Sequence, residues 1–83
     1  MEQLNTSRVL DASQVQRQVS RAGFKMNGYA RVYFDALPES EHLYGERGLK
    51  SQVLYFFCNC KAMTPEQKEV KRSLSRWAKG GKR

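Results

Sequence analysis

The sequence predicts an α+β domain made of a helix, a small antiparallel sheet of two or three strands and a second helix. Two segments with helix-capping signals, 12–22 and 65–79, lie on either side of a middle region. The middle region holds two runs of β-favouring residues, 29–36 and 52–61. With 83 residues the chain is expected to form one domain over 1–83, with flexible ends at 1–10 and 80–83.

The first helix is expected over 12–22. Asp11 and Gln14 have the three-residue spacing of a capping box, which marks a helix start. Apolar residues then recur with a helical period, at Val15, Val19 and Ala22. Gly23 stands where a left-handed C-cap ends a helix.

The first strand is expected over 29–36, because its residues alternate with a period of two after an Asn-Gly turn signal. Residues 24–26 would pair with this strand across the turn and so form a short third strand. Pro38 would end the strand, since proline has no N–H to donate to the ladder. The second strand is expected over 52–61, and its apolar residues on both faces indicate that both faces are covered.

Residues 38–50 are interpreted as a long acidic loop that connects the two strands. The segment contains three glutamates, two glycines and the only histidine, His42. Long loops in small domains often carry function, although no second chemical group converges on this one. A plain acidic excursion is the favoured interpretation.

The last helix has the clearest start in the chain. Thr64 is a suitable N-cap, Pro65 suits the first helical position, and Gln67 completes the Thr-x-x-Gln pattern of a capping box. Its apolar face is expected to carry Val70, Leu74 and Trp77, and its opposite face Lys68, Arg72, Arg76 and Lys79. Two glycines at 80 and 81 end the helix.

The core expected from these elements draws on both helices and both strands. It consists of Val15, Val19, Phe24, Val32, Phe34, Leu54, Phe56, Val70, Leu74 and Trp77.

The net charge of +7 is concentrated at the end of the chain. Residues 61–83 hold eight basic and two acidic residues, and so carry six of the seven charges. Such a concentration of positive charge attracts polyanions. The alternative is that it serves only to keep one helix face solvated. Helix C-termini favour cations, which accounts for two of the basic residues but not for the excess. The candidate phosphate contacts are Lys68, Lys71, Arg72, Arg76, Lys79, Lys82 and Arg83.

Aromatic and basic residues are expected to share one face of the predicted sheet. Tyr29, Arg31 and Tyr33 would lie beside Tyr55, Phe57 and Lys61. Interleaved aromatics and cations are typical of platforms on which nucleic-acid bases stack. The stacking candidates are Tyr29, Arg31, Tyr33 and Tyr55. The same face would serve a homodimer contact equally well, because Tyr, Phe and Arg are enriched at interfaces.

A helix followed by a hairpin also resembles a winged-helix DNA reader, in which Arg17 and Arg21 would project from the recognition helix. That arrangement needs a preceding helix to brace the recognition helix. The ten residues before Asp11 show no helical pattern, so this reader is disfavoured.

Metal binding and catalysis have little support in the sequence. Cys58, Cys60 and His42 supply three ligands, whereas a structural zinc site needs four, so the cysteines are interpreted as two buried thiols. No phosphate-binding loop, nucleophile elbow or pair of carboxylates on one element occurs. We expect a non-enzymatic protein without metal or cofactor.

The chain is expected to be soluble and cytoplasmic. It opens without a charged and apolar leader, and its longest apolar run, 53–58, is far too short to span a membrane. A homodimer is expected, since small domains often gain stability from self-association.

Two stretches, GYARVYFDALPES and LYFFCNCKAMTPEQKEVKRSLSRWAKGGKR, resemble the small conserved proteins encoded by Pf-type filamentous prophages of pseudomonads. The resemblance implies a bacterial regulator that maintains lysogeny or controls excision or replication. Together with the charge pattern it predicts a regulator that binds nucleic acid, DNA rather than RNA, through its basic C-terminal helix. The alternative is a regulator that binds a host or phage protein through its aromatic sheet face.

Overall fold

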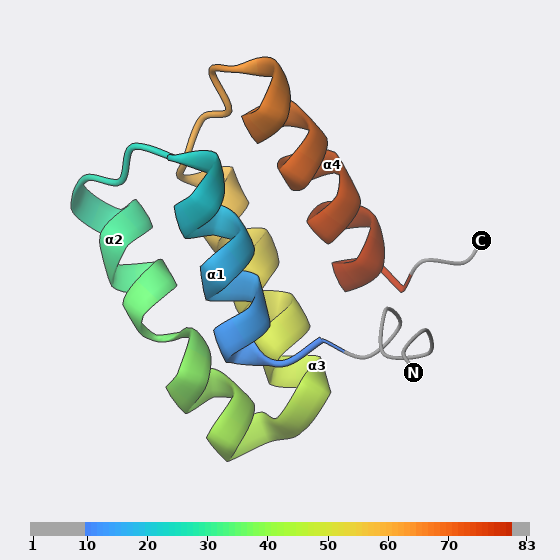
Figure 1. Cartoon of the computed structure of the whole chain (residues 1–83). Coiled ribbons are helices and arrows are strands. Elements are labelled where there is room, and N and C mark those ends of the chain that lie inside the picture. The colour runs from blue at the N-terminus through green and yellow to red at the C-terminus, as the bar shows by residue number, and fades with distance from the viewer. Residues whose placement is uncertain (1–9, 81–83) are drawn as a thin grey trace.

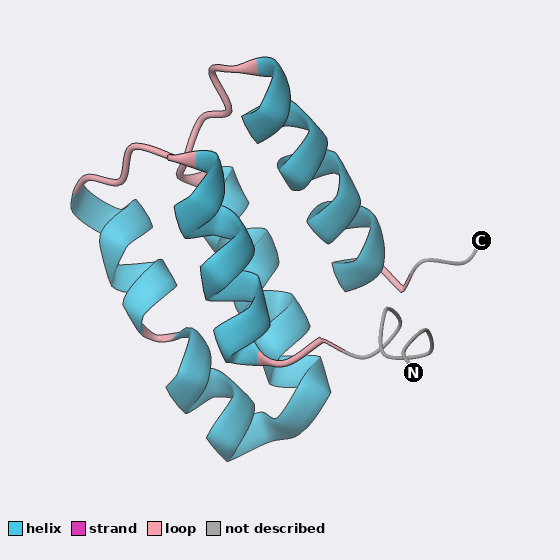
Figure 2. Cartoon of the chain, viewed as in Figure 1, coloured by secondary structure: helices cyan, strands magenta, loops and turns pink. Residues whose placement is uncertain are grey.

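The computed structural model describes residues 10–80, and within this range the protein consists of helices and loops without a strand (Figures 1 and 2). The helices are α1 (Ala12–Ala22), α2 (Gly28–Asp35), α3 (Leu37–Cys58) and α4 (Pro65–Ala78). The prediction of an α+β fold is therefore wrong, and the described chain is all-helical. The ends expected to be flexible, 1–10 and 80–83, lie outside the described residues except for Leu10 and Gly80.

The helices pack around one core. α3 contacts each of the other three helices, and α1 also packs against α4. Figure 1 shows α1 lying across the second half of α3, with α2 to one side and α4 to the other. α3 is bent into two arms, and the arm that follows the bend runs back through the middle of the molecule.

α1 has the boundaries that the sequence predicts. The Asp11 side chain accepts a hydrogen bond from the Gln14 amide at 2.9 Å, and the Gln14 side chain accepts one from the Asp11 amide at 3.1 Å. This reciprocal pair is the predicted capping box. Gly23 ends the helix with φ of 77°, as predicted for a left-handed C-cap.

α4 also begins where the sequence predicts. Thr64 accepts a hydrogen bond from the Gln67 amide at 3.0 Å, and Pro65 occupies the first helical position. The other half of the predicted capping box differs, because the Gln67 side chain accepts from the amide of Met63 rather than from that of Thr64. Gln67 also donates to the carbonyls of Ala22 and Gly23, so it joins the two helix ends.

The first predicted strand, 29–36, is wrong because these residues form α2 and the cap residue, Ala36, that joins it to α3. Apolar side chains directed at the core recur with a helical period, at Ala30, Tyr33, Phe34 and Leu37. The pattern of period two within the same residues placed Val32 in the core, whereas Val32 is 58% exposed. Pro38 does not end a strand but occupies the first turn of α3, where a missing N–H costs nothing.

The second predicted strand, 52–61, and the predicted loop, 38–50, are wrong for a related reason. Both belong largely to α3, whose buried face carries Leu49, Val53, Phe56 and Phe57 at helical spacing. Apolar residues on both faces of a supposed strand are also what a helix with a broad buried stripe produces. β-Branched and aromatic residues favour strands only weakly, and tertiary packing overrides that preference.

Two glycines allow α3 to fold back on itself. Gly45 has φ of 72° and ψ of −158°, a conformation that residues with a Cβ atom rarely adopt, and it divides α3 into an arm before it and an arm after it. Gly48 lies where the two arms are closest. A Cβ atom at this position would come within 2.5 Å of Tyr44 Cβ and 2.7 Å of the Ser40 carbonyl oxygen.

The predicted core is partly confirmed. Half of its members are buried, namely Val15, Val19, Phe24, Phe56 and Leu74. Four more are partly buried and pack against the core, namely Phe34, Leu54, Val70 and Trp77. Several large buried residues were not predicted, namely Leu37, Leu49, Val53 and Phe57, because they lie in segments interpreted as loop or as the opposite strand face.

Candidate nucleic-acid interface

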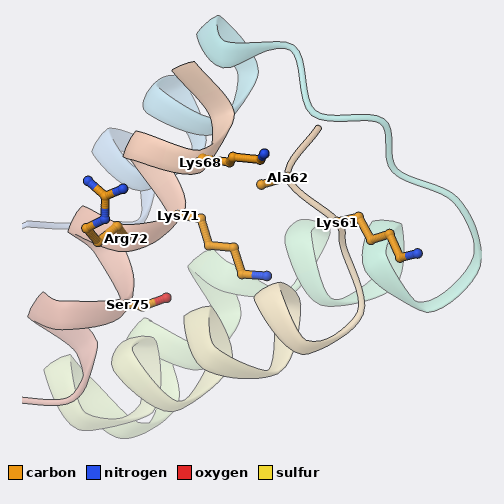
Figure 3. A pocket seen from close by; sticks show the side chains of 6 residues that line it. All are labelled: Lys61, Ala62, Lys68, Lys71, Arg72 and Ser75. Atoms are coloured by element: carbon orange, nitrogen blue, oxygen red, sulfur yellow. The ribbon is translucent and has the colours of Figure 1, made fainter. Parts of the chain in front are cut away.

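A basic pocket lies between α4 and the loop that joins α3 to α4. It has a volume of about 480 Å³ and is lined by Lys61, Ala62, Lys68, Lys71, Arg72 and Ser75. Four of these six side chains are cationic, and none is a carboxylate. Figure 3 shows Lys61 on the loop and the other three cations on α4.

Helix geometry explains why the cations of α4 gather on one side. At 100° per residue, Lys68, Lys71 and Arg72 fall on one flank of the helix, beside the buried stripe of Gln67 and Leu74. Arg76 and Lys79 continue the same flank. Of the acidic residues of α4, Glu66 falls on the opposite flank. Glu69 falls at the edge of the basic flank, where it pairs with Arg72.

The carboxylates of residues 10–80 leave this basic flank almost unneutralised. Arg72 pairs with Glu69 at 2.9 Å, and both side chains are more than 60% exposed, so the pair contributes little to stability. Among residues 10–80, the lysines of the pocket make no ion pair. The positive potential of the pocket therefore extends into solvent.

Lys71 lies deeper than its neighbours. Its side chain is partly buried, and Figure 3 shows it extending from α4 toward α3. Burial raises the pKa of the Cys60 thiol, and the positive charge of Lys71 opposes that rise. Cys60 donates a hydrogen bond to the Lys25 carbonyl at 3.3 Å, which fixes the base of the loop near the start of α2.

The predicted phosphate contacts divide into three groups. Lys68, Lys71 and Arg72 come together in the pocket. Arg76 and Lys79 are exposed on the same flank of α4 but do not line the pocket. Lys82 and Arg83 lie outside the described residues.

Lys61 was not predicted as a phosphate contact. The sequence predicts Lys61 at the end of a strand, on the face of the sheet that carries the aromatic residues. The feature of the sequence that points to Lys61 as a phosphate contact is its position at the start of the basic segment 61–83.

Three tyrosines form a row along α2 and α3, although no sheet brings them together. The ring centroids of Tyr29 and Tyr33 lie 6.5 Å apart, and those of Tyr33 and Tyr55 lie 6.0 Å apart. Tyr29 and Tyr33 meet because residues four apart share one helix face. We call Tyr29, Tyr33 and Tyr55 the tyrosine row; its end members are 72% and 56% exposed.

The other residues of the predicted sheet face are not part of this row. Arg31 lies on a different face of α2, where its guanidinium pairs with Asp35 at 3.4 Å. Phe57 is buried in the core and contacts Phe24 and Phe56. The aromatic platform predicted from strand geometry is therefore wrong in its composition.

The cysteines differ from each other in burial. Cys60 is buried as predicted, whereas Cys58 is exposed, so the prediction of two buried thiols is half wrong. Within residues 10–80, His, Cys, Asp and Glu side chains form no group of three or more that is placed to hold a metal ion. In the same range no helix combines the length and the apolar character needed to cross a membrane.

Comparisons with protein-family models, with curated proteins and with solved structures give no match to this chain.

Proposed function

We propose that the protein binds nucleic acid by gripping the phosphate backbone in the basic pocket of α4. The observation that supports this proposal is that Lys61, Lys68, Lys71 and Arg72 all line one pocket whose lining contains no carboxylate. The role in prophage regulation, with DNA as the target, stays a prediction from sequence resemblance.

The chemistry of the pocket suits a phosphate backbone. The lysines offer compact charges with several donors each, and the Arg72 guanidinium offers a fork that can meet two phosphate oxygens. Ser75 adds a hydroxyl at the same wall of the pocket. Contacts of this kind position a protein on nucleic acid without reading its sequence.

Salt dependence is the quantity that tests the proposal. Four phosphate contacts predict that affinity for a DNA duplex falls about a hundredfold between about 50 and 200 mM salt, because each contact releases condensed counterions. Fluorescence anisotropy with labelled DNA of mixed sequence measures this slope.

A matched pair of double variants separates the pocket from general charge. Lys68→Gln with Arg72→Gln removes two cations, four residues apart, from the pocket, and should flatten the slope of log K against log salt by about 1.8. Arg17→Gln with Arg21→Gln removes two exposed cations with the same spacing from α1, and should leave the slope nearly unchanged. Equal losses in both double variants would show that only net charge matters and would refute the pocket as the binding site.

A further inference from the structure

We infer that the nucleic acid bound by the basic pocket is single-stranded, with its bases stacked on the tyrosine row. This inference rests on the proposed function, because the basic pocket supplies the phosphate contacts that bring the strand to the rings. The occupant follows from the chemistry of two surfaces that the end of α3 connects, one cationic and one aromatic.

The row has the geometry of a stacking surface. Neighbouring rings are tilted by only 33° and 37° from each other, so they present their faces in similar directions along the surface of α2 and α3. The backbone that carries two of the rings is anchored, because Gln52 donates a hydrogen bond to the Tyr33 carbonyl at 3.2 Å and Asn59 donates one to the Tyr55 carbonyl at 2.9 Å. A tyrosine side chain has only two χ angles, so ordering a ring under a base costs little conformational entropy.

The row is connected to the basic pocket through the end of α3. Tyr55 lies on the last turn of that helix, which Asn59 closes, and Lys61 follows two residues later. The hydrogen bond from Cys60 to the Lys25 carbonyl ties this segment to the residues that precede α2 and Tyr29. In Figure 3 the Lys61 side chain extends away from α4, so its charge is available beyond the pocket.

Charge complementarity favours a polyanion on this combined surface. Asp35, the acidic residue of α2, lies on another face of the helix and is paired with Arg31. Lys61 and the three cations of α4 line the pocket, and Lys61 is the one that follows the last turn of α3, which carries Tyr55. A backbone held by these cations would carry its bases toward the rings.

The tyrosine row favours single strands over double strands because only single strands have base faces that are free to stack on the rings. In a duplex the faces of the bases are already stacked on one another, and only the terminal pairs expose them. In a single strand each base can leave its neighbour and stack on an aromatic side chain, a mode that depends little on sequence.

The test compares binding of the full chain to a labelled oligothymidylate, to the same length of abasic deoxyribose phosphate strand, and to a duplex. Tyr29→Leu and Tyr55→Leu each remove a ring at an exposed position while keeping an apolar helix-forming residue. Each should weaken binding to the oligothymidylate by between about fivefold and about a hundredfold. Neither should change binding to the duplex or the abasic strand, and the salt slope should stay the same.

Leu43→Ala is the control for loss of an exposed apolar side chain, since Leu43 is 57% exposed and lines neither the basic pocket nor the pocket that Tyr55 lines. It should leave all three affinities unchanged. The abasic strand tests the same inference with an unaltered protein, and should bind more weakly than the oligothymidylate by the combined factor of the rings.

The outcomes separate the two proposals. Equal affinity for the oligothymidylate and the abasic strand, with both sensitive to Lys68→Gln and Arg72→Gln, would overturn the stacking inference and leave the phosphate pocket intact. Absence of binding to all three probes would overturn both. Self-association of the wild type that Tyr29→Leu or Tyr55→Leu abolishes, without base-dependent binding, would assign the row to a second copy of the chain and overturn the inference.

Discussion

Gln67 connects the two most predictable helix ends in the protein. Its side chain donates to the carbonyls of Ala22 and Gly23 and accepts from the Met63 amide, and the residue is only 6% exposed. Carbonyls at a helix C-terminus lack intrahelical partners, so a buried amide side chain there satisfies groups that would otherwise be costly. The sequence predicts Gln67 as a helix cap but not its contact with α1, because a local motif carries no information about distant carbonyls.

Gln67→Leu should destabilise the protein by about 2 kcal/mol or more, because it leaves these buried backbone groups without partners. Urea denaturation followed by circular dichroism measures the loss. Gln18→Leu is the control, since Gln18 is partly buried and its side chain makes no hydrogen bond with another described residue. A loss no larger in Gln67→Leu than in Gln18→Leu would contradict this role.

Cys60 should make the stability of the fold depend on alkaline pH. Burial raises the pKa of its thiol, so the folded state favours the neutral form. Its contribution is complete below about pH 8.5, where the thiol of the unfolded chain is also protonated, and is lost as pH rises toward the folded-state pKa.

The loss is at most about 1.4 kcal/mol per pH unit for this one group. Denaturation at a series of pH values from neutral to about 10 should therefore show a steeper decline in the wild type than in Cys60→Ala. Cys58→Ala, which alters the exposed thiol, should keep the steeper decline. If the free energy of unfolding declined equally with pH in all three proteins, Cys60 would not be the source of the pH dependence.

At the scale of elements, α1 and α4 are predictable because their signals are local. Each begins at a side chain that caps the helix within three residues, and each shows a single apolar stripe. α2 and α3 are not predictable from the same kind of evidence. Their aromatic and β-branched residues fit a period of two and a helical period equally well over short windows, and only the packing of both arms of α3 decides between them.

The bend in α3 depends on glycine at the point of closest approach. Helix propensity alone predicts that Gly48→Ala stabilises the protein by about 1 kcal/mol. The structure predicts the opposite sign, because the new Cβ atom would overlap Tyr44 and a backbone oxygen of Ser40. Overpacking of this kind costs about 1 to 3 kcal/mol.

Thermal denaturation of Gly48→Ala decides between these two expectations. Ser51→Ala, an exposed substitution on the same arm of α3, is the control and should change the stability by less than about 0.5 kcal/mol. A melting temperature of Gly48→Ala above that of the wild type would refute the close approach of the two arms.

At the scale of the whole molecule, the candidate site is better predicted than the fold that carries it. Charge counts along the chain locate the excess of cations in residues 61–83, and helical spacing on α4 brings Lys68, Lys71 and Arg72 to one pocket. Lys61 joins them only through the turn between α3 and α4. Tyr29, Tyr33 and Tyr55 meet on helix faces, whereas the sequence pattern predicts that they meet on a sheet.

The arrangement divides the surface into regions of different chemistry. The basic flank of α4 and Lys61 form one region, and the tyrosine row of α2 and α3 forms another. Arg17 and Arg21 are exposed on α1, outside the pocket. A polynucleotide attracted by net charge alone would lose as much affinity when Arg17 and Arg21 are neutralised as when Lys68 and Arg72 are, whereas one bound in the pocket would not.

Mapping of amide chemical shifts by NMR during titration with an oligonucleotide tests the central claim most directly, because it reports where on the protein the strand binds. The account predicts shifts at Lys61, Lys68, Lys71 and Arg72 that weaken as salt is raised, with little change at Arg17 and Arg21. Shifts centred on α1, or a saturated complex in which the four pocket residues do not change, would contradict it.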